Sequence, residues 1–128
     1  MIQIDPYNRI PLYEQVLVKI RQLILREVLS SDERMPSVRE LAQSTGVNPN
    51  TIQKAYKELE RTGYLYTIQG RGSFVASPEH IHDPLRKEQI IMQLEHLLYE
   101  AQYLKISQAR LVALVTPFIS DNEEEPHD

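Results

Sequence analysis

Apolar residues recur every three or four positions near the start of the chain, which is the spacing of one face of a helix. The series begins at Leu12 and continues to Leu29, and Pro11 stands where proline suits the first turn of a helix. Between these ends the stripe contains Val16, Ile20, Leu23 and Ile24. The pattern predicts a first helix from residue 11 to about residue 29.

A second, shorter helix is predicted from the pattern of its capping residues. Ser37 and Glu40 have the S-x-x-E spacing in which a serine hydroxyl and a glutamate carboxylate satisfy each other's main-chain N–H groups. The helix is expected over residues 38–44, because Gly46 follows and favours a positive φ that ends a helix.

A third helix is expected to begin directly after this turn. Asn48 is a good N-cap residue, Pro49 suits the first helical position, and Gly63 marks a stop after about Thr62. One face of this helix is apolar, and it consists of Ile52, Ala55, Tyr56 and Leu59.

Two β-prone runs come next, at residues 64–68 and 73–76. They flank the glycine-rich segment 69–72, and this arrangement is typical of a β-hairpin.

The last part of the chain carries a longer helical pattern. Apolar residues repeat at spacings of 4, 3, 4 and 3, which predicts a helix of about 20 residues with a heptad-like seam. The seam consists of Ile90, Leu94, Leu97, Ala101 and Leu104, and Leu98 widens it. Ser107 is expected to begin a further short helix, which Pro117 should kink or end.

These elements indicate a fold that is mainly α-helical with a small β-hairpin. We expect a winged helix-turn-helix domain over residues 1–77 and a linker over 78–84. A two-helix C-terminal dimerisation segment should follow over 85–120, and residues 121–128 form an acidic tail expected to be disordered.

Composition narrows the class of protein. The chain has 128 residues and no cysteine, which excludes disulfides and thiolate metal sites and favours a cytoplasmic location. No signal peptide pattern and no run of 18 apolar residues is present, so a membrane location is not expected. Ser, His and Asp occur without a nucleophile motif, so the chain is not expected to be an enzyme.

Charge is distributed unevenly along the chain. The net charge is −4, but residues 1–78 hold 10 Lys and Arg against 8 Asp and Glu, a net of +2, whereas residues 79–128 have a net of −6. This difference fits phosphate binding by the first part alone.

His80, His82 and Asp83 could suggest a metal site, but three such side chains in a linker are more often only polar residues. We therefore expect no metal and no cofactor.

Two short helices around a glycine turn, followed by a hairpin, assign positions to the polar residues. The second helix of such a pair places its N-terminal residues in the major groove of DNA, and the hairpin tip approaches the backbone or minor groove. The residues in these places are Arg39, Asn48, Pro49, Asn50, Thr51, Gln53, Lys54, Gly70 and Arg71. Each group alone has a simpler explanation, as helix-start chemistry, a solvated helix face or a turn, and only their order makes the pattern specific.

The stretch MPSVRELAQSTGVNPNTIQKAYKELERTGYLYTIQGRGSFVA closely resembles the DNA-binding domain of the GntR family of bacterial transcription regulators. PLYEQVLVKIRQLI resembles the family's first helix, so that the resemblance covers residues 8–77. It implies DNA contacts at Arg39, Asn48, Asn50, Thr51, Gln53, Lys54, Gly70 and Arg71. Many members have arginine where this chain has Asn48-Pro49-Asn50.

The short remainder is similar to the YtrA-type branch of the family, because it is too short for the large effector domains of other branches. That branch implies a homodimer often encoded near ABC-transporter genes. We expect a cytoplasmic regulator, more specifically a repressor that binds double-stranded DNA at a palindromic operator. The alternative is a winged-helix module that binds protein, and a small-molecule effector, if there is one, would have to bind at the dimer interface.

Overall fold

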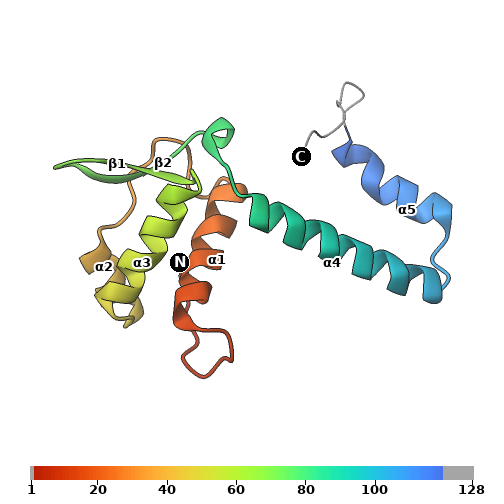
Figure 1. Cartoon of the computed structure of the whole chain (residues 1–128), viewed down its shortest axis with the longest axis horizontal. Coiled ribbons are helices and arrows are strands. Elements are labelled where there is room, and N and C mark those ends of the chain that lie inside the picture. The colour runs from red at the N-terminus through yellow and green to blue at the C-terminus, as the bar shows by residue number, and fades with distance from the viewer. Residues whose placement is uncertain (1, 120–128) are drawn as a thin grey trace. The chain divides into compact units, whose positions relative to one another are not determined.

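The computed structural model describes residues 2–119 and divides into two compact units between Asp83 and Pro84. Figure 1 shows the order of the elements along the chain. The first unit contains α1 (Leu12–Leu25), α2 (Val38–Thr45), α3 (Pro49–Arg61), β1 (Leu65–Ile68), β2 (Gly72–Val75) and the 3-10 turn η1 (Pro78–His80). The second contains α4 (Pro84–Tyr103), α5 (Gln108–Val115) and the 3-10 turn η2 (Thr116–Phe118).

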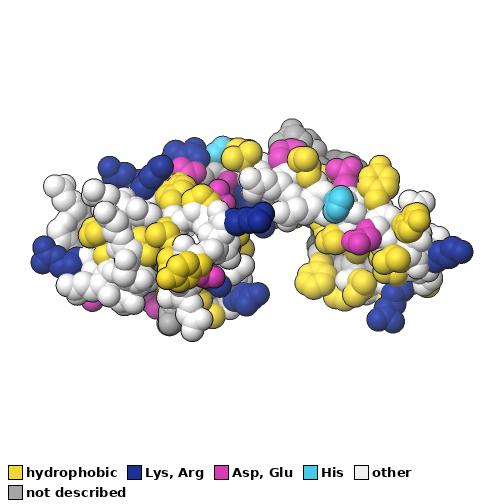
Figure 2. Space-filling view, turned by 90° about the horizontal axis from the view of Figure 1, so that it is seen from below, with side chains coloured by type: hydrophobic (Ala, Val, Ile, Leu, Met, Phe, Trp, Pro, Cys, Tyr) yellow, Lys and Arg dark blue, Asp and Glu magenta, His cyan; other side chains and the backbone are white. Residues whose placement is uncertain are grey.

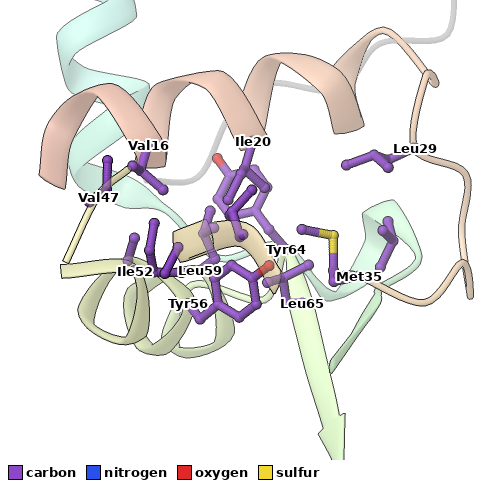
Figure 3. Close-up of a cluster of buried hydrophobic side chains, with 14 residues drawn as sticks. Val16, Ile20, Leu29, Met35, Val47, Ile52, Tyr56, Leu59, Tyr64 and Leu65 are labelled. Carbon is purple, nitrogen blue, oxygen red and sulfur yellow. The ribbon is translucent and has the colours of Figure 1, made fainter. Parts of the chain in front are cut away.

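The core of the first unit lies between α1 and α3. Val16 and Ile20 of α1 point toward Ile52 and Leu59 of α3, and all four side chains are fully buried (Figure 3). Burial of this apolar surface is the main force that fixes one helix on the other. Because the apolar face of α3 is used in this way, its polar face and its N-terminus remain outside.

The predicted start of α2 is confirmed. The Ser37 hydroxyl accepts a hydrogen bond from the Glu40 main-chain N–H at 3.0 Å, and the Glu40 carboxylate accepts one from the Ser37 N–H at 2.9 Å. At the other end Gly46 has a φ of 76°, where a glycine carries no steric penalty, and donates its N–H to the Ala42 carbonyl. These local contacts set the turn that leads into α3.

The first helix is shorter than predicted, since it ends at Leu25 rather than near Leu29. Beyond Arg26 the chain turns at Glu27, which has a φ of 57°, and the next two N–H groups bond to the Leu23 carbonyl. Leu29 nevertheless lies in the core. An apolar residue is needed at position 29 because it packs in the core from a turn. The sequence pattern could not distinguish this contact from a further turn of helix, so the predicted helix was too long.

A third segment of the chain pairs with the hairpin, and the sequence did not indicate it. The strands β1 and β2 pair antiparallel, with Leu65 opposite Val75. On the other edge of β2, the N–H groups of Asp32 and Met35 donate to the carbonyls of Val75 and Ser73 at 2.7 and 2.8 Å. The segment 32–35 therefore supports the hairpin along its length.

The last residues of the first unit are attached to it. The Tyr64 hydroxyl donates to the Asp83 carboxylate at 2.8 Å, and Arg21 lies 3.8 Å from the same oxygen. Gly63 has a φ of 83°, and a Cβ there would overlap the His80 carbonyl oxygen. A glycine is thus needed at this position for two reasons, the backbone conformation and the close approach of η1.

The second unit exposes much of its apolar surface. In the predicted seam Ile90, Leu94, Leu97, Leu98 and Leu104 are between 40% and 66% exposed, whereas Ala101 is buried within the chain. Figure 2 shows several hydrophobic side chains on the surface of this unit. The helix α5 ends before Pro117, as expected. None of the described helices is long and apolar enough to cross a membrane, and the predicted acidic tail lies outside the described residues.

Candidate nucleic-acid interface

The N-terminus of α3 presents short polar side chains. Asn48 and Asn50 are exposed, and Thr51 is half-buried. The Asn48 side-chain oxygen accepts the Asn50 N–H at 2.8 Å, which caps the helix and leaves the Asn48 amide group as a donor. This end of the helix also carries the positive end of its dipole, which favours an anion such as a phosphate.

Arg39 joins this polar end from the first turn of α2. It lines an open depression together with Gln43, Gly46, Asn48 and Pro49. The fold therefore brings the predicted arginine beside the start of α3, although eight residues lie between Arg39 and Asn48 in the sequence. A guanidinium group beside two uncharged polar residues can contact a phosphate or the edge of a guanine.

Gln53 lies one turn further along α3 than Pro49. It lines a second depression between α3 and the hairpin, together with Lys57, Thr67 and Ser73. The Thr67 hydroxyl donates to the Glu60 carboxylate at 2.8 Å. Gln53 is exposed in this depression, and a glutamine amide can pair with the edge of a base.

Lys54 occupies a third direction. Its ammonium group lies 4.7 Å from the centre of the Tyr13 ring, a cation–π contact between α3 and α1. Burial raises the pKa of Tyr13, and the Glu58 charge adds to this effect. The structure thus places Lys54 against α1, apart from the depression that contains Gln53.

The hairpin tip carries the last two predicted residues. Gly70 has a φ of 81°, and the Arg71 N–H closes the turn on the Ile68 carbonyl at 2.9 Å. The Arg71 side chain is exposed. The tip also has a partner that the sequence analysis missed: Arg34 donates from Nε to the Arg71 carbonyl at 3.1 Å. No local motif marks Arg34, because the contact joins residues far apart in the chain.

Two further ionisable side chains of α3 contact their own unit. Arg61 lies 2.6 Å from the Glu58 carboxylate, and this hydrogen bond lowers the pKa of Glu58 and raises the pKa of Arg61. The Tyr56 hydroxyl donates to the Pro36 carbonyl at 2.7 Å, and burial raises its pKa. These contacts stabilise the scaffold, whereas Arg39, Lys57 and Arg71 are exposed near the predicted interface.

Asp83, one of the residues considered as a metal ligand, is instead bonded to Tyr64 and paired with Arg21. Within residues 2–119, no cluster of three or more His, Asp or Glu side chains is arranged to hold a metal ion.

Comparison with known proteins agrees with this geometry. Residues 12–75 match the bacterial regulatory proteins of the gntR family. The chain is 40% identical over 114 residues to the HTH-type transcriptional repressor YtrA of Bacillus subtilis (strain 168), which covers 87% of this chain and 86% of that protein. This result confirms the resemblance to the YtrA-type branch.

Two solved structures extend the comparison. YtrA from Sulfolobus acidocaldarius, a GntR-family transcription factor, has a TM-score of 0.60 at 32% identity and covers 76% of this chain and 97% of its own. The DNA-binding domain of AraR, solved in complex with operator ORR3, has a TM-score of 0.52 at 37% identity and covers 57% and 88%. The winged helix-turn-helix fold and the expectation of a regulator rather than an enzyme are both confirmed. The chain therefore belongs to the GntR family and is a DNA-binding transcription regulator.

Proposed function

We propose that this regulator binds a palindromic operator as a homodimer and represses transcription. The observation that carries the proposal is the shared depression of Arg39 and Asn48 beside the exposed N-terminus of α3. In a helix-turn-helix protein, this end of the second helix enters the major groove. The neighbouring hairpin then brings Arg71 to the sugar–phosphate backbone or the minor groove.

The candidate residues divide into two roles. Gln53 and Asn50 carry amides, whose paired donor and acceptor suit adenine in the major groove. Thr51 and the main chain at Gly70 suit phosphate contacts, which position the protein without reading sequence. Arg39 can serve either role. Lys54 would contact DNA after release from Tyr13, and Pro49 shapes the end of the helix.

The exposed seam of α4 supports a homodimer. Leu94 and Leu97 are both more than half exposed, and they repeat with the heptad-like spacing of a helix that packs on another helix. A contiguous exposed apolar surface marks an interaction site. Its burial against a second copy stabilises by roughly 25 cal/mol per Å² of apolar area. A two-fold dimer presents two recognition helices, which explains the proposed palindrome.

Repression is proposed because a bound dimer at a promoter excludes RNA polymerase, and because the Bacillus subtilis relative is named a repressor. A role at transporter genes follows from the YtrA-type resemblance. The proposed location is the cytoplasm, because a regulator that binds DNA has to be in the compartment that holds the chromosome.

Titration of the purified chain against DNA from its own upstream region, at several salt concentrations, tests the proposal. Specific binding releases counterions, so log Kd should rise linearly with log salt, with a slope of roughly 0.9 per phosphate contacted. A footprint should cover two half-sites related by a two-fold axis. A flat salt response without a footprint would favour the protein-binding alternative.

Two substitutions then separate the roles. We expect Gln53→Ala to relax sequence preference, with a loss of about 1–3 kcal/mol on the preferred site. We expect Arg71→Ala to weaken binding to all sequences by a similar factor and to lower the salt slope by about 1. If Gln53→Ala changed neither affinity nor preference, the orientation proposed for α3 would be wrong.

A further inference from the structure

The main chain at Arg34 is held against the edge of β2. It is paired with Phe74 across the edge of β2, and the neighbouring Met35 N–H donates to the Ser73 carbonyl at 2.8 Å. From this edge the side chain extends to the hairpin tip, where Nε donates to the Arg71 carbonyl. Arg34 therefore connects two parts of the hairpin: its main chain pairs with β2, and its guanidinium group contacts the tip.

The residue after Arg71 makes space for this contact. Gly72 has a φ of 112°, and a Cβ on it would lie only 3.3 Å from Arg34 Nε. A larger residue would press on the guanidinium group. Gly72 thus admits both the turn and the arginine that lies over it.

The contact has a specific consequence for Arg71. Its N–H bonds to the Ile68 carbonyl and its own carbonyl accepts from Arg34, so both polar main-chain groups are held. Only its side chain extends to the surface. A two-stranded hairpin is marginally stable by itself, and a tip that is ordered before binding loses less entropy when it meets DNA.

We propose that Arg34 is a positioning residue for DNA binding, which holds the main chain of the hairpin tip so that the Arg71 side chain reaches the DNA backbone. This inference rests on the proposed function. Its charge also extends toward α2: hydrogen bonds from Ser37 are the main reason why the pKa of Glu40 is lowered, and the Arg34 charge adds to them. The competing role is a direct phosphate contact by Arg34 itself.

A double-mutant cycle distinguishes the two roles. Operator affinity is measured for the parent, Arg34→Gln, Arg71→Ala and the double variant. If Arg34 acts through Arg71, each single change should weaken binding about tenfold, the scale of one hydrogen bond to a charged group, and the double variant should be no weaker than Arg71→Ala. Arg26→Gln is the matched control, since Arg26 is exposed at the end of α1 and the change removes the same charge.

Two results in this cycle would overturn the inference. One is a double variant whose loss equals the product of the two single losses, because independent contacts behave in this way. The other is an Arg34→Gln variant that binds as tightly as the parent.

A measurement without DNA separates this inference from the proposed function. Hydrogen exchange of the Arg71 amide should be several-fold faster in Arg34→Gln than in the parent, with the amides of α1 unchanged. Unchanged exchange at Arg71 would refute the role of Arg34 even if operator binding fell. Absence of operator binding by the parent would instead refute the proposed function, and the exchange rates would still decide whether Arg34 holds the tip.

Discussion

At the residue scale, the two polar atoms of the Asn48 side chain have separate roles, one in the fold and one in the proposed contact with DNA. Its side-chain oxygen caps α3, and its amide nitrogen is a donor on the exposed end of the helix. Sequence alone could not separate these roles, because an N-cap asparagine looks the same in a protein that never meets DNA. A substitution that keeps the oxygen and removes the donor can separate them.

Asn48→Asp is that substitution. Aspartate caps a helix as well as asparagine and interacts favourably with the helix dipole, so thermal stability should be unchanged or slightly higher. Operator binding should fall, since a carboxylate would face the phosphates. Asn48→Ala is the comparison, and it should lose about 1 kcal/mol of stability as well as binding. Unimpaired DNA binding by Asn48→Asp would remove Asn48 from the interface.

At the scale of elements, features set by neighbouring residues could be predicted and features set by distant ones could not. The starts of α2, α3 and α5 were predicted because each depends on a cap residue and the three positions after it. The edge pairing of segment 32–35 was missed, since its partner is about 40 residues away. The contact of Lys54 with Tyr13 was missed for the same reason.

The cap of α2 gives a prediction about the stability of the fold. Ser37→Ala should lower the free energy of unfolding by about 1 kcal/mol at neutral pH, measured by urea denaturation. Ser44→Ala is the matched control in the same helix, and it should cost much less, since alanine favours the helix and the Ser44 hydroxyl donates only to the Leu41 carbonyl of the same helix. Equal losses in the two variants would contradict the capping role.

The same cap includes a carboxylate whose pKa is lowered in the folded state, by hydrogen bonds from Ser37 above all. Its charge therefore stabilises the fold fully above the ordinary glutamate pKa, and the contribution is lost as the pH falls through the lowered value. Glu40→Gln keeps the shape and removes the charge. The difference in stability between parent and Glu40→Gln should disappear in acid, and a difference that grew instead would contradict this assignment.

At the scale of the whole molecule, the two units differ in how they bury apolar surface. The first closes its own core around Ile20, Ile52 and Leu59, whereas the second leaves most of its predicted seam exposed. Periodicity predicted the length of α4, about 20 residues, but it placed the end of α1 about four residues too late. It could not say that Ala101 would be covered within the chain, because a small residue on a helical stripe suits an intramolecular contact as well as an intermolecular one.

Leu94→Asp tests whether a second copy covers this seam. Since Leu94 is 52% exposed in the single chain, the substitution should leave the fold of each unit intact. It would bury a charge in the proposed dimer, which is costly. We expect a monomer by sedimentation, and operator affinity at least about 100-fold weaker, because two linked half-site contacts become one.

The matched control for this change is Met92→Asp, which places the same charge on the same helix. Met92 is 67% exposed and lies about 200° around the helix from Ile90, at 100° per residue, on the side opposite the seam. It should remain dimeric and bind the operator as the parent does. If Leu94→Asp also stayed dimeric, the seam would not be the interface. If both variants became monomers, the interface would include the opposite face of α4, and packing through the seam alone would be wrong.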